Sequence, residues 1–472
     1  MNTWILIAGV LVPLLGALLL PFIGNVSEKL RNGLALFFVA FGFLSSFLAL
    51  PAAISGNPLS FRVEVPLGLS FGLYADAMAI FMAMAATFVS FIIVLYSFGY
   101  IGHYPNQNEY YMMISLFIGA MLGLVYSTNL IAIYIFWEIS ALCCWRLIGF
   151  YRDDLAIKRA NKAFIVTVLG ALIMFVGFVG IYGQTGTFEL TAMKGVALPA
   201  WIVLLILFGI LSKSATFPLH SWLPDAGVAP SPVTSLLHAA VLVKIGVYAY
   251  ARFFVLTFDI PDLFQTWVPT IAAVSALLSA GVALRENDIK RVVAYSTISQ
   301  LAFILLGLSS GNEIGFVGGL LYILAHSIAK GGLFLCAGIV EHALHTKDMS
   351  KMGGLAKTMP FTAFAYILCA FSVMGIPPFS GFFAKYLVID GIVTSGQIGL
   401  GFAFIIGAVM TVMYLIRLFV KVFLGPQVNP SVKEGSPIMV ASVVTLGIVA
   451  LVLGTMMFWP SQLAWLAYGG VI

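Results

Sequence analysis

The sequence predicts an all-α polytopic membrane protein with about 14 transmembrane helices, arranged as two inverted five-helix repeats with one broken helix in each. Three observations lead to this fold class. Apolar residues make up 61% of the 472 residues and charged residues only 9%, far below the roughly 25% charged residues of soluble proteins. The apolar residues form long runs, and two of these runs are interrupted by proline close to a lysine. The composition excludes a soluble enzyme, a nucleic-acid-binding protein and a disordered chain.

A run of about 20 apolar residues is long enough to cross a bilayer as a helix. We expect such helices, in chain order, at residues 3–23, 32–54, 73–97, 108–125, 129–149, 163–183, 199–217, 232–254, 266–284, 291–309, 314–340, 360–380, 399–424 and 437–458. The seventh run continues past Pro218 into a short second piece, and the twelfth continues past Pro377 and Pro378. No basic residue precedes the first run, so we expect a spanning helix there and not a cleaved signal.

The spans group into four predicted units. They are an N-terminal unit of three helices (1–107), a first five-helix repeat (108–254), a second, inverted five-helix repeat (266–424), and a last helix with a short tail (437–472). The two broken spans are five spans apart, so they cross the membrane in opposite directions, as an inverted repeat requires. Direct sequence similarity between the repeats is faint. The prediction therefore depends on the two helix breaks, on the lysine beside each, and on the odd number of spans that separates them.

The basic residues of the loops predict the orientation. Sixteen of the 23 Lys and Arg residues, Lys290 among them, fall on the side opposite to both termini, whereas only Arg62, Lys194 and Arg252 fall on the terminal side. Cytoplasmic loops carry the excess of basic residues. We therefore expect an integral protein of a prokaryotic cytoplasmic membrane with both termini on the non-cytoplasmic side.

Five ionisable residues lie deep inside predicted spans: Lys213, Lys244, Lys330, Lys385 and Glu138. Each costs at least about 2.5–3.5 kcal/mol at the bilayer centre on insertion scales, so these groups must face the protein interior, pair with one another or touch water. One carboxylate can neutralise only one of the four lysines. Desolvation lowers the pKa of an amine in general, and an amine that titrates near neutrality can both hold and release a proton.

Three histidines accompany the lysines. His238 lies six residues before Lys244, and His326 lies four residues before Lys330, on the same helix face. His220 follows the break in the seventh span. Imidazole titrates near physiological pH and passes protons through either ring nitrogen, so these residues are candidates for a proton relay.

Each candidate also has a structural alternative. A lysine near a span end, as Lys385 is, can snorkel to the interface. Glu138 could serve only as a salt-bridge partner, and His238 or His326 taken alone could be packing residues.

Neither a cofactor nor a metal site is expected. The cysteines all lie in apolar runs without a C-x-x-C pair, namely Cys143, Cys144, Cys336 and Cys369, which argues against a disulfide framework, an iron–sulfur cluster or a zinc site. No G-x-x-x-x-G-K-[ST] stretch occurs, so the energy for transport must come from a neighbouring subunit.

Several stretches together resemble the antiporter-like proton-translocating subunits of respiratory complex I, membrane-bound hydrogenases and Mrp-type cation/proton antiporters. They are WLPDA…APSPVTSLLHAAVLVKIG, ENDIKRVVAYSTISQLAF, HSIAKGGLFLCAG, KDMSKMGGL and GIPPFSGFFAK, and the resemblance covers roughly residues 70–425. It implies a non-catalytic, ion-translocating subunit of a redox-driven complex that contains paralogous subunits. In that family protons enter a cytoplasmic half-channel, cross a hydrated central axis and leave through a second half-channel.

The resemblance gives each matching residue a place in that path. Glu138 resembles the fifth-span glutamate that pairs with the seventh-span lysine, Lys213. Lys244 resembles the eighth-span lysine, Lys330 with His326 the eleventh-span relay, and Lys385 the terminal lysine of the twelfth span.

Some features depart from parts of the family. One complex I paralogue has glutamate where this chain has Lys385, and many relatives have a histidine in the loop that reads PDAGVAPSP here. Because the sequence stops soon after the fourteenth span, we expect no long lateral helix like that of the largest paralogue. We expect the medium-length type, closer to the redox-driven complexes than to Mrp.

The alternative function is an Mrp-type Na⁺/H⁺ antiporter subunit that works without electron transfer. A sodium site needs several oxygen ligands, and one deep carboxylate among a surplus of lysines suits protons better. A non-conducting scaffold is disfavoured because four costly lysines remain. The expected partners are other membrane subunits, the lipid bilayer and protons, with Na⁺ in the alternative, and no nucleic acid.

Overall fold

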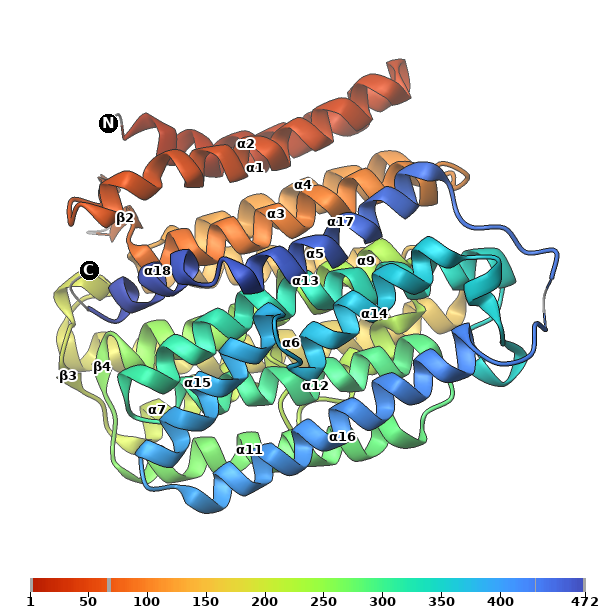
Figure 1. Ribbon diagram of the computed structural model, residues 1–472. Coiled ribbons are helices and arrows are strands. Elements are labelled where there is room, and N and C mark those ends of the chain that lie inside the picture. The colour runs from red at the N-terminus through yellow and green to blue at the C-terminus, as the bar shows by residue number, and fades with distance from the viewer. Residues whose placement is uncertain (1–2, 66–68, 429, 470–472) are drawn as a thin grey trace.

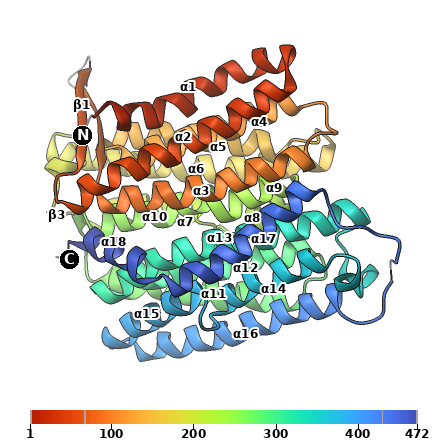
Figure 2. The same ribbon diagram turned by 45° about the horizontal axis from the view of Figure 1, so that its top comes forward.

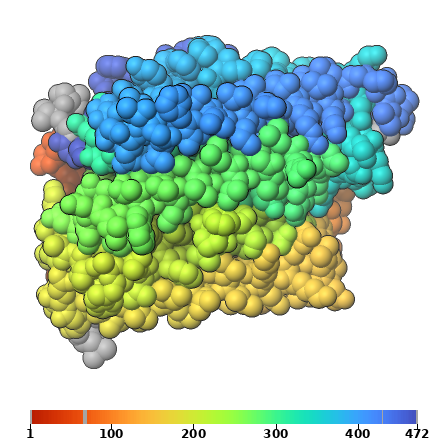
Figure 3. Space-filling model, turned by 90° about the horizontal axis from the view of Figure 1, so that it is seen from below, coloured from red at the N-terminus to blue at the C-terminus, as the bar shows by residue number. Residues whose placement is uncertain are grey.

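The computed structural model describes residues 3–65, 69–428 and 430–469. Residues 1–2 and 470–472, at the two ends of the predicted terminal units, lie outside the described residues. Long helices run side by side along one direction (Figures 1 and 2), and their side chains close into a broad slab (Figure 3). Of the described helices, twelve are long and apolar enough to cross a membrane. The all-helical membrane fold is confirmed, whereas the count of about 14 spans stays a prediction.

The N-terminal part contains a β-hairpin that the sequence analysis missed. Its elements are α1 (Trp4–Val26), α2 (Glu28–Ile54), β1 (Leu59–Val65), β2 (Leu69–Ala75) and α3 (Ala77–Tyr100). The strands pair antiparallel. The predicted start of the third span at residue 73 is wrong, because residues 73–75 belong to β2. The helix begins after Asp76, whose carboxylate accepts a hydrogen bond from the Ala79 amide at 2.8 Å and so caps it.

The next part holds the first broken helix. Its elements are α4 (Gln107–Tyr126), α5 (Leu130–Ile148), α6 (Asp154–Thr185), η2 (Leu190–Ala192), β3 (Val196–Ala197), α7 (Ala200–Lys213) and α8 (Trp222–Asp225). The predicted end of the seventh span at residue 217 is wrong, since α7 ends at Lys213. Pro218 explains this end, because its ring would clash with the carbonyl of Ser214 in a continuous helix.

The eighth span runs over Ser231–Val255 and is not a regular α-helix. It follows the short turn η3 (Ala226–Val228) and consists of α9 (Ser231–Ser235), the π-helical turn η4 (Leu236–Ala240), α10 (Leu242–Tyr250) and a second π-helical turn, η5 (Ala251–Val255). Strand β4 (Phe258–Asp259) then pairs with β3. Turns of π-helix inside α-helices are frequent at functional sites.

The rest of the chain holds the second broken helix. Its elements are α11 (Leu263–Arg285), α12 (Ile289–Leu308), α13 (Glu313–Leu344), η6 (Met349–Lys351), η7 (Leu355–Lys357), α14 (Pro360–Met374), α15 (Ser380–Thr394), α16 (Ile398–Phe423), α17 (Pro437–Thr455) and α18 (Phe458–Tyr468). The predicted twelfth span, 360–380, divides at Met374, whose carbonyl would clash with Pro378 in a continuous helix. Helix α18 replaces the tail that was expected after the last span.

Burial separates the central spans from the outer ones. The apolar window of the eighth span is 100% buried and that of α13 is 94% buried, whereas that of α16 is only 33% buried. Helix α13 packs against α3, α9, α12, α14, α15 and α17. The fold therefore places the residues of these two spans in the interior, away from lipid.

Candidate functional site

Lys213 lies at the first helix break and contacts the backbone of α5. Its side chain is 0% exposed, and its ammonium donates a hydrogen bond to the carbonyl of Trp137 at 3.2 Å and lies 5.2 Å from the centre of that ring. Gly246 lets α10 approach this break, because a Cβ there would lie 2.7 Å from the carbonyl oxygen of Ile210.

Glu138, the residue next to Trp137, does not form the ion pair with Lys213 that the resemblance implied. The ion pairs found within 4.0 Å among the described residues do not include these two side chains. Glu138 is partly exposed on the side of the bundle, and its Oε1 has no hydrogen-bond partner among the described residues. Lys213 instead bonds the carbonyl of Trp137, one residue before Glu138, and the two charged groups interact through space without direct contact.

The eighth span carries His238 and Lys244 in the interior. His238 lies in the π-helical turn η4 and is 0% exposed, and Lys244 is 1% exposed. Both ring nitrogens of His238 and the ammonium nitrogen of Lys244 have no hydrogen-bond partner among the described residues. The ring of His238 lies 4.5 Å from that of Phe334 on α13.

Helix α13 carries His326 and Lys330, which are equally buried. Both ring nitrogens of His326 lack a hydrogen-bond partner within the described part of the chain. Lys330 donates to the hydroxyl of Ser296 and, at 3.3 Å, to the carbonyl of Val293 on α12.

Lys385 lies at the second helix break and does not snorkel. Its side chain is 5% exposed, and it donates to the carbonyl of Met374 at 3.3 Å. Its nitrogen lies 5.8 Å from the ring centres of both Phe303 and Tyr322. Gly375, with φ of +83°, makes room for its side chain, since a Cβ there would lie 2.9 Å from the Cδ of Lys385.

A hydrogen-bond network that the sequence analysis missed connects the surroundings of Lys330 and Lys385. Ser296, which accepts from Lys330, shares a hydrogen bond of 2.7 Å with Tyr414. Gln300 bonds Tyr414 at 3.2 Å and accepts from Tyr322, whose ring lies beside Lys385. The available signal was the spacing of Ser296 and Gln300, four residues apart on one face of an apolar helix.

His220 stands apart from the other candidates. It lies between α7 and α8 and is partly exposed, its Nδ1 is buried without a hydrogen-bond partner in the described residues, and its ring lies 5.5 Å from that of Phe217. The other six basic side chains, which we call the basic row, are all buried within the bundle: Lys213, His238, Lys244, His326, Lys330 and Lys385.

The basic row consists of four amines and two imidazoles, groups that can accept and release protons. Protonated amines and imidazoles repel cations, and no group of three or more His, Cys, Asp or Glu residues that could hold a metal was found in the described ranges. Buried polar atoms without a protein partner cost about 1–3 kcal/mol each unless water satisfies them. The arrangement therefore suits a hydrated path along which protons move.

Comparison with known proteins identifies the family. A family model described as NADH:quinone oxidoreductase/Mrp antiporter, TM, matches residues 127–411, and one described as NADH-Ubiquinone oxidoreductase (complex I), chain 5 N-terminus, matches residues 64–111. The chain is 36% identical to NAD(P)H-quinone oxidoreductase chain 5 of Synechocystis sp., over 76% of this chain and 55% of that protein. It is 33% identical to a Na⁺/H⁺ antiporter subunit of Alkalihalophilus pseudofirmus, over 96% of this chain and 61% of that protein. The chain thus spans between about half and two thirds of the length of these curated relatives.

Solved structures share the fold over nearly their whole length. A chain of the Mrp complex from Dietzia sp. matches with a TM-score of 0.88 and 22% identity, over 98% of this chain and 96% of that one. A chain of the archaeal membrane-bound sulfane sulfur reductase matches with a TM-score of 0.89 and 24% identity, over 99% and 98%. A chain of respiratory complex I from Thermus thermophilus matches with a TM-score of 0.86 and 22% identity, over 99% and 100%. This chain is an integral membrane protein that belongs to the NADH:quinone oxidoreductase/Mrp antiporter family.

Proposed function

We propose that the chain is the antiporter-like, proton-translocating subunit of a multi-subunit membrane complex in which redox chemistry in other subunits drives transport. One observation carries this proposal. His238, Lys244 and His326 are buried in the two most enclosed spans, and their nitrogens have no hydrogen-bond partner among the described residues. Groups of this kind are costly inside a membrane and indicate a functional site such as a proton relay or an ion pathway. A purely structural role would have supplied each with a partner.

The route follows the basic row. Protons pass from Lys244 towards Lys330 and on towards Lys385, with the hydroxyls of Ser296, Tyr414 and Tyr322 as carriers. Gln300 orients Tyr414 and Tyr322 by hydrogen bonds, and water carries the proton between these two hydroxyls. Hydroxyl groups can pass a proton because each both donates and accepts hydrogen bonds. The network supports a path between the two lysines because it starts at a hydrogen bond of Lys330 and ends at Tyr322, whose ring lies beside Lys385.

Glu138 and Lys213 serve as the coupling point to a neighbouring subunit. Glu138 is partly exposed on the side of the bundle, where charges of an adjacent chain can reach it, and Lys213 contacts the carbonyl of Trp137, one residue before Glu138. Two unit charges about 8 Å apart interact by roughly 2 kcal/mol at an effective dielectric near 20. A change of charge next door can therefore alter the proton affinity of the basic row.

The same proposal extends to topology and partners. The twelve long helices and the two shorter apolar ones, each followed by a break and a second helical piece, support 14 spans. The two breaks, each with a lysine bonded to a backbone carbonyl, support inverted repeats over 108–254 and 266–424, flanked by the units 1–107 and 437–472. We further propose paralogous subunits as partners, a prokaryotic cytoplasmic membrane, both termini on its outer side, and no cofactor on this chain.

A Na⁺/H⁺ antiporter subunit without electron transfer is the second candidate. The similarity to the Alkalihalophilus antiporter protein, which extends over 96% of this chain, favours it. The basic row argues against a sodium path within this chain, because Na⁺ would need oxygen ligands where six basic groups lie. A partner subunit would have to supply that path.

The test is proton uptake by the purified complex in proteoliposomes. We expect Lys244→Ala to reduce the uptake rate at least about a hundredfold while the complex stays assembled. Lys357→Ala, an exposed lysine in η7, is the control and should leave uptake unchanged. Normal uptake by an assembled Lys244→Ala complex would exclude the proposed route, and sodium-dependent uptake without any redox substrate would favour the second candidate.

A further inference from the structure

A cavity of about 850 Å³ opens where the loops after α3, α11 and α13 meet. It lies at the end of the bundle that the loop charges predict to be cytoplasmic. Its lining is rich in groups that exchange protons: His103, His342, His345, Asp288, Glu341 and Asp348. The rings of His103 and His342 lie 5.8 Å apart. Water in this cavity can deliver protons to any of these side chains.

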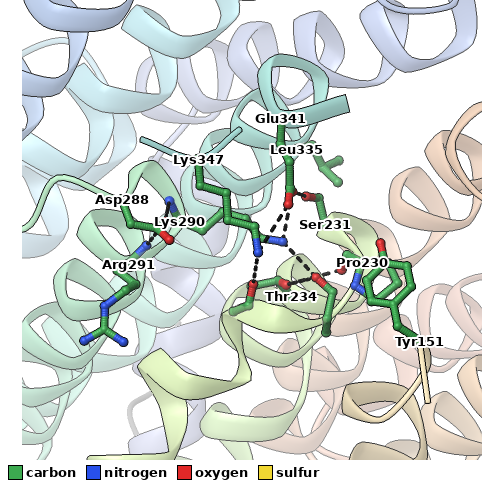
Figure 4. Close-up of polar contacts among 12 residues, drawn as sticks. Tyr151, Pro230, Ser231, Thr234, Asp288, Lys290, Arg291, Leu335, Glu341 and Lys347 are labelled. Carbon is green, nitrogen blue, oxygen red and sulfur yellow. Dashed lines mark hydrogen bonds and ion pairs between the residues drawn. The ribbon is translucent and has the colours of Figure 1, made fainter. Parts of the chain in front are cut away.

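Glu341 and Lys290 form an ion pair (Figure 4), and Glu341 also lines the cavity. The sequence places Lys290 among the loop charges, but in the structure its side chain is only 1% exposed. Its ammonium donates to Glu341 at 3.1 Å and to the carbonyl of Ala229 at 2.8 Å. Glu341, at 17% exposure, faces the cavity and also contacts Lys347 at 3.3 Å.

The first helical turns of α12 and α9 hold this pair in place. Asp288 caps α12 by accepting hydrogen bonds from the backbone amides of Lys290 and Arg291 at 2.8 and 3.0 Å, which sets the direction in which the Lys290 side chain leaves the helix. The hydroxyl of Ser231 at the start of α9 donates to Glu341 at 2.9 Å.

A column of polar side chains leads inward from this pair. Ser231, Ser235 and His238 follow one another at spacings of four and three residues, so they share one face of the eighth span, and all three are 0% exposed. Ser235 donates to the carbonyl of Gly331 at 3.3 Å, next to Lys330. Gly338 lets α9 and α13 approach, because a Cβ there would lie 2.5 Å from the Cβ of Ser231. The column therefore ends at the basic row.

We propose that Glu341 and Lys290 form the proton uptake site of this subunit, an inference that rests on the proposed function. Glu341 accepts a proton from the water of the cavity. Lys290 releases its proton inward, Ser231 and Ser235 each accept one proton and give up their own, and His238 receives the last. Glu341 then reprotonates the Lys290 amine, so that one proton has entered for each proton passed on and the pair returns to its starting charge.

Chemical labelling of a cavity residue tests this site. Because the label is added after the complex has folded and assembled, a loss of uptake does not reflect a folding defect. The four native cysteines are all buried, so a new thiol can be labelled selectively. We expect His342→Cys to form an active complex that loses at least about tenfold in proton uptake once a positively charged methanethiosulfonate reagent is added to that face. Lys357→Cys, exposed at the same end, is the control and should tolerate the label.

Two direct substitutions complete the test. Glu341→Gln and Lys290→Met should each lower the uptake rate at least about tenfold, whereas Lys357→Met should not. If the wild-type complex takes up protons, and the labelled and substituted complexes do so at the same rate, the uptake site is wrong and the proposed function stands. If the wild-type complex moves no protons at all, the proposed function itself fails.

Discussion

Two ion pairs lie at the two ends of the eighth span. They differ in whether the positively charged side chain can release a proton. At the Ser231 end, Lys290 pairs with Glu341 beside the cavity of about 850 Å³. At the Val255 end, Arg252 pairs with Asp76 through two hydrogen bonds of 2.5 and 2.9 Å beside a smaller cavity of about 390 Å³.

The difference between lysine and arginine assigns opposite tasks to the two ends. A guanidinium stays protonated in proteins, so Arg252 can hold a carboxylate and exclude cations but cannot hand on a proton. An amine can lose its proton when it is buried. Under the proposed function, protons would enter at the lysine end, the arginine end would pass none, and the second helix break would be the way out.

The largest expected effect is on stability at the arginine end. Arg252→Met leaves Asp76 without its partner, and we expect a loss of about 2–3 kcal/mol, between the values for exposed and fully buried pairs. The melting temperature of the purified complex measures it. Arg62→Met removes the Arg62–Glu64 pair, whose side chains are 57% and 68% exposed, and should have no measurable effect. Equal melting temperatures for the two variants would show that the Arg252–Asp76 pair does not stabilise the fold.

The exchange of the two cations tests the comparison itself. Lys290→Arg keeps the charge and the pair with Glu341 but removes the releasable proton, so we expect about a tenfold slower proton uptake with an unchanged melting temperature. Arg252→Lys should do the reverse and allow passive proton leak through the sealed end, which a pH-sensitive dye inside proteoliposomes reports. A Lys290→Arg complex that pumps at the wild-type rate would remove the distinction between the two ends.

The smallest effect is a pH dependence that comes from Asp76. Burial alone would raise the pKa of this carboxyl, but the charge and hydrogen bonds of Arg252 and the backbone amides at the start of α3 lower it below its ordinary value. The ionised form therefore stabilises the fold at pH values above that ordinary pKa, near 4, and this stabilisation is lost as the pH falls through the lowered pKa. As the pH is lowered below about 4, the melting temperature of the complex should fall less steeply for Asp76→Asn than for the wild type. Parallel curves would contradict this role.

The sequence predicted the membrane fold and the interior lysines because both depend on local composition. Long apolar runs can only be spanning helices, and a lysine such as Lys244 in such a run must find a polar environment. The two helix breaks were also predictable, since each proline forbids a continuous helix. The ends of α7 and α14 were predicted too far along the chain. The reason is that a proline ring clashes with the carbonyl four residues before it, so the helix must end upstream of the proline.

Contacts between distant segments were beyond the sequence. Lys290 and Glu341 are 51 residues apart, and Ser296 and Tyr414 are 118 residues apart, so no helical spacing relates either pair. Lys290 follows a charged loop and was counted with it, whereas the cap at Asp288 places it in the first buried turn of α12. The hairpin of β1 and β2 was missed because β2 directly precedes the apolar run of α3 and was counted with it.

The central claim is that water joins the unpartnered groups of the basic row into one path for protons. A cryo-electron microscopy map of the assembled complex, at a resolution that shows ordered water, tests it most directly. We predict water density within hydrogen-bond distance of the ring nitrogens of His238 and His326 and of the Lys244 nitrogen, continuous towards Lys330. Apolar side chains packed directly against these nitrogens, with dry protein between the spans, would contradict it.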